Sequence, residues 1–311
     1  MKNKILGFTT AILFLVAIFT ACKKENGTSS DNSNEAAVQS DDQERFSSET
    51  EAATNDADAA LEITTSFTGR LDHTQINPWS CDATIAIDSS SDPMTITVTY
   101  SGSCLGNRTR TGSVVLSMAK ATHWKDQGAS VSLTFQNLKI TRTSDNKSIT
   151  INGTLTYTNA SGGLVIGLPA LGGSITHTIA SNDMSVTFDN NTQRTWQVAR
   201  QRVITYDNGF VIAVSGTHTE NGVQNIAEWG INRLGHAFTT STIQPVVVRQ
   251  DCNFRIVSGE VQHVTPAVTL VTTFGLDATG NPTACPGTGS YYFKSVWTGA
   301  GGKSITIIMP Y

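Results

Sequence analysis

Five arginines at two places in the chain are spaced so that they could form an anion-binding surface. Arg108 and Arg110 lie two residues apart, as do Arg200 and Arg202, and Arg194 has the parity of the second pair. Side chains two residues apart share one face of a β-strand, so neighbouring strands would carry a basic stripe on the polar face of a sheet. Such a stripe could bind carboxylates or sulfated sugars. The pattern favours the plainer interpretation, a solvated face balanced by scattered acids.

The other titratable side chains form no motif that indicates catalysis or metal binding. The six histidines lie in different segments without metal-ligand spacing, and there is no nucleophile-elbow, zinc-protease or phosphate-loop motif. His218-Thr219-Glu220 could place two polar side chains on one strand face, but Asn221-Gly222 follows and indicates a hairpin end. We therefore predict no catalytic, metal or cofactor site, and a protein that is not an enzyme.

Four cysteines beyond residue 60 are expected to form disulfides, because their number is even and the chain begins like an exported protein. Four cysteines allow three pairings. The two ends of the domain look alike, because each has a cysteine, a proline, an alternating run, a glycine and a second cysteine in that order. This likeness predicts the pairs Cys81–Cys104 and Cys252–Cys285. Zinc binding is the alternative, but no CxxC pair or nearby histidine supports it.

Residues 1–21 resemble the signal peptide of a bacterial lipoprotein. Lys2 and Lys4 precede an uncharged apolar run that is short for a membrane span and ends in Phe19-Thr20-Ala21-Cys22. Lipoprotein signal peptidase requires small residues before the cysteine, although Phe19 replaces the commoner leucine. The resemblance implies that Cys22 becomes the mature amino terminus and carries a diacylglyceryl group and an acyl chain such as palmitate, which suffice for stable anchoring. An ordinary secretory signal is the alternative.

Residues 22–60 are predicted to form an acidic disordered tether. Residues 23–60 contain ten acidic and three basic side chains, a net charge of −7, and such polar segments bury too little apolar surface to fold. The Ala- and Glu-rich part from 46 to 61 could form a short helix. Because the whole chain carries −4 and the signal peptide +2, residues 61–311 are left with +1. A surface so close to neutral argues against nucleic acid as a partner.

Residues 61–311 are predicted to form a single all-β domain. Apolar and polar residues alternate over 93–100, 131–135 and 148–157, which is typical of antiparallel strands solvated on one face. Turns rich in Asn and Gly separate the runs, and a phase slip predicts a β-bulge near Gln136-Asn137. We expect a meander of roughly fourteen strands that curls or splits into a two-layer sandwich, with a half-barrel as the alternative.

The stretch from Gly162 to Gly173 breaks this pattern, because it is uncharged and lacks polar side chains. It is expected to be an apolar loop or short helix that covers the open end of the core. The alternative is a surface patch that touches lipid or a partner.

The order of these features resembles a family of Bacteroidetes outer-membrane lipoproteins that have no assigned activity. The matching segments are 104–112, 193–196 and 252–259, within a likeness that spans about residues 75 to 310. The resemblance implies an outer-membrane address. Lys23-Lys24-Glu25 also resembles the surface-export signals of such bacteria, which implies exposure at the cell surface, with a periplasmic-facing position as the alternative.

We therefore expect a membrane-anchored surface lipoprotein that serves as a non-enzymatic binding or structural module for a glycan, protein or lipid. One alternative is a lipid-carrying half-barrel with 162–173 as its lid. Another is a hydrolase whose site is assembled from distant residues. A packed interior favours the first function, an open apolar groove the second, and a pocket with two converging titratable groups the third.

Overall fold

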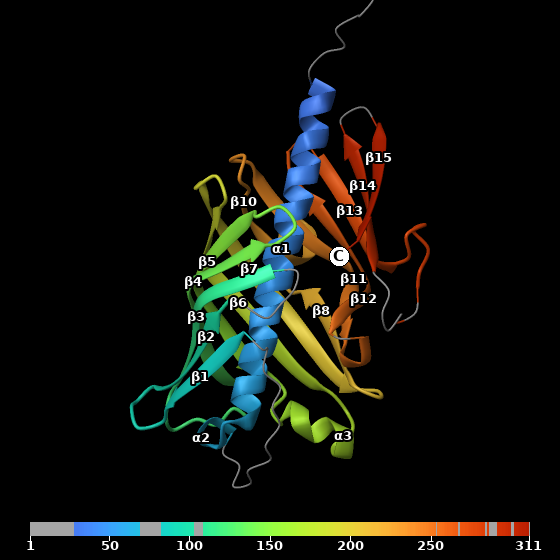
Figure 1. Ribbon diagram of the computed structural model, residues 1–311. Coiled ribbons are helices and arrows are strands. Elements are labelled where there is room, and N and C mark those ends of the chain that lie inside the picture. The colour runs from blue at the N-terminus through green and yellow to red at the C-terminus, as the bar shows by residue number, and fades with distance from the viewer. Residues whose placement is uncertain are drawn as a thin grey trace, which may run out of the picture.

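The computed structural model describes residues 28–68, 82–102, 108–252, 254–266, 268–283, 285, 291–299 and 302–310. Fifteen strands among these residues form one antiparallel sheet. The predicted all-β antiparallel meander is confirmed. The described strands curl as a single sheet around a long helix, and they do not split into two stacked layers (Figure 1).

The strands follow one another at short intervals along the chain. The first seven are β1 (Ala83–Asp88), β2 (Met94–Ser101), β3 (Arg108–Met118), β4 (Ala129–Arg142), β5 (Ser148–Asn159), β6 (Ile175–Phe188) and β7 (Gln193–Tyr206). The other eight are β8 (Phe210–Gly216), β9 (His218–Glu220), β10 (Val223–Ile231), β11 (Ala237–Arg249), β12 (Arg255–Val264), β13 (Val268–Leu276), β14 (Tyr292–Gly299) and β15 (Ser304–Pro310).

The sheet runs in sequence order from β1 to β7 and then from β10 to β15. Strands β8 and β10 share one place in this order. The first half of β7 pairs with β10 through Trp196–Val198, and its second half pairs with β8 through Arg200–Tyr206. Strand β11 divides its pairing in the same way. The hairpin expected at His218-Thr219-Glu220 is present, because β9 pairs with the start of β10.

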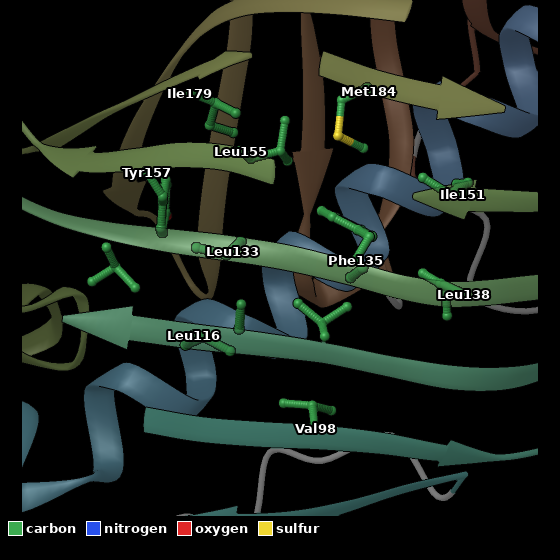
Figure 2. Packing of buried hydrophobic residues seen from close by; sticks show 14 of the residues in the cluster. Val98, Leu116, Leu133, Phe135, Leu138, Ile151, Leu155, Tyr157, Ile179 and Met184 are labelled. Carbon is green, nitrogen blue, oxygen red and sulfur yellow. The ribbon is translucent and has the colours of Figure 1, made fainter. Parts of the chain in front are cut away.

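The inner face of the sheet is built from the apolar residues whose alternation predicted the strands. Leu116 of β3 lies opposite Leu133 of β4, which in turn lies opposite Leu155 of β5. All three side chains are buried, and Figure 2 shows them side by side on neighbouring strands. Burying each such leucine stabilises the fold by about 2 kcal/mol, so one continuous ladder supplies much of the core.

A series of β-bulges bends the sheet. The bulge predicted near Gln136-Asn137 is confirmed, because the register between β4 and β5 shifts between Phe135 and Leu138. The register between β5 and β6 shifts between Asn152 and Thr156, and that between β6 and β7 shifts between Ser181 and Met184. Bulges increase local twist and curvature. Their repetition on successive strands explains how a sheet this wide curls around a helix.

Gly153 lies where two of these bulges meet, and we expect Gly153→Ala to destabilise the fold. Its φ is +119°, and a Cβ atom there would lie 2.7 Å from both the Asp183 carbonyl oxygen and the Met184 Cα. Strain and overlap together predict a loss of about 2–4 kcal/mol, measured by urea unfolding. Gly222→Ala is the matched control, because φ is +82° there but a Cβ would meet no heavy atom within 4 Å. Equal losses in both variants would refute the close approach.

Most of the segment that was predicted to be a disordered tether is a helix in the structure. Residues 22–27 lie outside the described residues, and Thr28–Ile63 form helix α1. Phe46, Ala53 and Leu61 of α1 belong to the same buried cluster as the strands, so the folded unit begins well before residue 61. The composition argument failed because it assumed that the acidic side chains would find water, whereas the sheet supplies partners for them. None of the described helices is long and apolar enough to cross a membrane.

Four short helical elements lie at the ends of the described strands. Helix α2 (Thr65–Thr68) follows α1 and buries Phe67, whose carbonyl oxygen accepts the Trp124 backbone N–H at 2.7 Å. The stretch from Gly162 to Gly173 contains η1 (Val165–Gly167) and α3 (Leu168–Leu171), and it buries Val165 and Leu168 against Ile204 and Ile212. This segment covers one end of the core, as expected. A further turn, η2 (Gln250–Cys252), ends β11.

Candidate functional site

Four of the five arginines that the sequence singled out face α1 from the inner face of the sheet. We call this surface the arginine trough, defined by Arg108 and Arg110 of β3 and by Arg200 and Arg202 of β7. Strands β4, β5 and β6 separate β3 from β7 in the sheet, so the two pairs approach α1 from different sides. The stripe is therefore on the buried face, and the expectation of a solvated polar face is wrong.

The arginines of β3 bind carboxylates of the helix and of the chain before β1. Arg110 donates two hydrogen bonds to Asp82, at 2.9 and 2.6 Å, and a third to Asp56 of α1 at 3.0 Å. Its guanidinium lies over the Tyr100 ring, 4.3 Å from the centroid. Arg108 forms an ion pair with Glu49 at 3.1 Å. This wall of the trough thus holds the helix through charge pairs and one planar cation–π contact.

The arginines of β7 bind the opposite side of α1. The Arg202 Nε lies 3.1 Å from a Glu51 carboxylate oxygen, and its Nη1 lies 3.7 Å from Asp58. Arg202 also donates to the Tyr157 hydroxyl at 2.9 Å and is fully buried. Arg200 pairs with Glu228 of β10 and lies 3.9 Å from Glu51. This wall matches the first in charge and is more deeply buried.

The acidic residues of α1 repeat at the spacing that this arrangement needs. Glu49 and Asp56 are seven residues apart, as are Glu51 and Asp58. Seven residues are about two helical turns, so each pair forms one row. Residues two apart project about 200° from each other, which places the Glu49 row and the Glu51 row on different sides of the helix. Each row therefore meets one arginine wall.

Glu228 of β10 contacts both the sheet and α1, near the amino-terminal part of the buried length of the helix. Its carboxylate accepts hydrogen bonds from Trp196 Nε1 at 2.9 Å and from Ser47 of α1 at 2.8 Å, and it also contacts Gln43 and Arg200. The Trp196 ring in turn packs on Phe46 with a centroid distance of 4.4 Å. Polar and apolar contacts between helix and sheet therefore share the same residues.

Two further ion pairs hold α1 outside the trough. Arg233, between β10 and β11, donates to both Asp42 oxygens at 2.7 and 2.6 Å. Arg142, at the end of β4, donates to Asp41 at 2.6 Å, and this pair is partly exposed. Arg194 takes no part, because its guanidinium donates to the backbone carbonyls of Asn232 and Arg233.

The arginines only partly offset the unfavourable effect of burial on the charged carboxylates of α1. Burial raises the pKa of Asp42, Glu49 and Asp56, and the neighbouring arginines lower these pKa values by less than burial raises them. Among the described residues, both Glu51 oxygens lie close to a guanidinium, and Asp58 Oδ1 lies 3.8 Å from His177 Nδ1, but none of these three oxygens has an aligned hydrogen bond. The trough therefore binds carboxylates at a cost in desolvation.

Tyr157, His177 and Asp58 converge on Arg202 and could in principle do proton transfer. The Tyr157 hydroxyl lies 2.6 Å from His177 Nδ1, and burial lowers the His177 pKa to about 4, so the imidazole is neutral at pH 7. His177, Tyr157 and Arg202 are all fully buried. A substrate has no access to this cluster while α1 is in place.

The predicted disulfide at the carboxyl-terminal end is present. Cys252 and Cys285 are bonded, with Cα atoms 5.5 Å apart, inside the usual range. Cys81 and Cys104, the other predicted pair, lie outside the described residues, as does the predicted lipidation site Cys22. Among the described residues, the potential metal ligands that lie together are Asp251, Cys252 and Cys285, but the two sulfurs are in the disulfide and are not free thiolates.

Sequence reasoning identified the arginines of the trough and missed their partners. The seven-residue spacing of the α1 acids was the signal that could have revealed them.

Comparison with known proteins finds no matching family model, no similar curated protein and no similar solved structure.

Proposed function

We propose that the protein is a lipid-anchored, non-enzymatic binding module of the bacterial outer membrane, and that the arginine trough recognises carboxylate-bearing ligands. The observation that carries this proposal is the trough itself, because all four of its inward-facing arginines lie within 4 Å of a carboxylate of α1. Arginine is suited to this task because its planar fork pairs with carboxylates in fixed geometry.

The anchoring half of the proposal rests on the lipobox-like segment ending at Cys22 and on the likeness to outer-membrane lipoproteins. Cys22 precedes α1 by six residues. Helix α1 begins near the anchor and ends inside the sheet, and its first turns extend past the strands in Figure 1. It is thus suited to be a stalk that places the domain at the cell surface.

The structure offers less support for an acyl-chain carrier. A carrier needs an open apolar groove, but the inner face of the described sheet carries four arginines and is filled by α1. A hydrolase would need access to the cluster around Tyr157 and His177, which α1 covers.

Ligand recognition is tested with poly-L-glutamate as the probe and the full mature chain as the receptor. We expect weak binding to the wild type and at least about tenfold tighter binding to a Glu49→Gln/Glu51→Gln/Asp56→Asn variant, because α1 then competes less for the trough. Adding Arg200→Gln and Arg202→Gln to that variant is the control and should abolish the gain. If hydrogen exchange shows α1 released in the triple variant and poly-L-glutamate still fails to bind, recognition by the trough is excluded.

Anchoring is tested separately in cells fed labelled palmitate. The wild type should incorporate label and sediment with outer membranes, and Cys22→Ser should do neither. Surface exposure predicts digestion by a protease added to intact cells, whereas protection would place the domain on the periplasmic side. An unlabelled wild-type chain would contradict the lipoprotein assignment.

A further inference from the structure

Every copy of this chain carries both the arginine trough and a helix that fits it. The two acidic rows of α1 match the two arginine walls, and the Phe46 ring of α1 packs on Trp196 of β7. A second copy offers the same rows at the same spacing. Exchange of α1 between two copies would therefore preserve every contact of the trough while joining the chains.

The contacts that hold α1 give little preference for its own chain. Eight described side chains on its buried surface are polar or charged, namely Gln39, Asp42, Arg45, Glu49, Thr50, Thr54, Asp58 and Glu62. Three of its buried apolar residues are alanines, which bury little area. Buried ion pairs contribute little net stability because desolvation offsets their attraction. Helix docking thus depends on complementarity, which a second copy supplies equally.

The connection from the helix to the sheet is long enough for exchange. Helices α1 and α2 form one connected unit, because Thr64, between them, donates its backbone N–H to the Ala60 carbonyl and its own carbonyl accepts that of Phe67. Thirteen residues, 69–81, then separate this unit from Asp82. A chain of that length can span at most about 45 Å when extended. That reach is comparable with the width of a small domain, so α1 and α2 can enter a neighbouring sheet.

We propose that the trough accepts the α1–α2 unit of a second copy, which produces a reciprocally swapped dimer. This inference rests on the proposed function, because it names the carboxylate-bearing ligand of the trough as the chain's own helix in another molecule. Domain exchange is a low-cost route to dimers because it creates few new contacts. Two copies anchored in one membrane would also meet at high effective concentration.

Complementary charge variants test the exchange in the full mature chain. Glu51→Arg places like charges against Arg200 and Arg202, and Arg202→Glu places like charges against Glu51 and Asp58. Each variant alone should melt several degrees below the wild type. After equimolar co-refolding from urea, swapped heterodimers unite the native helix with the native trough and the reversed helix with the reversed trough. We expect a raised Tm and a 1:1 heterodimer mass by native mass spectrometry.

A second pair of charge variants keeps the test valid if Glu51→Arg or Arg202→Glu does not fold. Asp41→Arg and Arg142→Glu reverse a partly exposed ion pair, so each chain should fold alone. Co-refolding should again enrich the heterodimer over either homodimer. A mixture in which both pairs of variants melt as independent monomers, with no heterodimer mass, overturns the exchange. Poly-L-glutamate binding by the triple amide variant would survive that result, so the failure of exchange and the failure of ligand recognition are distinguishable.

Discussion

Arg202→Met should lower the free energy of unfolding by about 3–5 kcal/mol, because it removes one partner of a buried charge network. Arg202 is fully buried and lies against Glu51, Asp58 and the Tyr157 hydroxyl. Without it, two carboxylates stay in the interior without their main counter-charge. Methionine keeps most of the side-chain volume, so the loss reports charge and not a cavity.

The charge origin of this loss is tested by removing the stranded carboxylates as well. Adding Glu51→Gln and Asp58→Asn to Arg202→Met should recover a large part of the stability, because neutral groups are cheaper to bury. Arg249→Met is the matched control. Arg249 also pairs with two acids, Asp251 at 2.9 Å and Asp207 at 3.5 Å, but at the surface, so its loss should cost at most about 1 kcal/mol. Urea unfolding of the wild type and these three variants measures the free energies. If Glu51→Gln and Asp58→Asn recover no stability in the Arg202→Met background, the charge network is ruled out as the cause.

The strands were predictable because their signal is local. Alternation follows from the pleat, and the phase slip after Phe135 marks a bulge that the register of β4 and β5 confirms. Curling into a single sheet was one of the two predicted outcomes. The choice between them depends on how the bulges of successive strands align and on the helix inside the curl, and both bring together residues far apart in the chain.

The short helix expected over 46–61 lies within α1, but the full length of α1 and its burial in the sheet were not predicted, because much of its buried side is polar. Composition predicts that Asp, Glu and Ser side chains face water, and apart from Arg45 the arginines that neutralise the acids of α1 lie far from it in sequence. The arginines were predicted to face water, and they face the interior instead. Their shared parity was recognised, but Arg200 and Arg202 also share parity with the buried Trp196 and Val198 of β7. That shared parity already indicated that the guanidinium groups point inward.

Glu62 links the carboxyl end of α1 to the segment that covers the core, and it should make the fold sensitive to alkaline pH. Its carboxylate accepts the backbone N–H groups of Val165 and Ile166 at 3.1 and 3.2 Å. Burial, and then the negative charge of Asp58, raise the Glu62 pKa from 4.5 to about 8. Glu62 is therefore mainly protonated in the folded protein at pH 7 and ionised in the unfolded chain.

The direction of the pH effect follows from proton release. Between the unfolded pKa of 4.5 and the folded pKa of about 8, unfolding releases the Glu62 proton, so stability falls as pH rises. The slope is about 1.4 kcal/mol per pH unit for one group, which amounts to at most about 5 kcal/mol across this window. Glu62→Gln keeps an acceptor for the backbone N–H groups but cannot ionise. It should resemble the wild type at pH 4.5 and exceed it in stability at pH 8 and above.

Urea unfolding at pH 4.5, 6, 7 and 8.5 gives the difference between the two proteins, which isolates Glu62 from other groups that titrate in this range. The difference should grow steadily and level off above pH 8. Glu220→Gln is the control for the same substitution at the surface, because Glu220 is about half exposed on the β9–β10 hairpin. If Glu62→Gln and the wild type lose stability in parallel as pH rises, Glu62 is already ionised in the fold. The carboxylate would then hold α1 to the covering segment as a charge, and raising the pH would not release it.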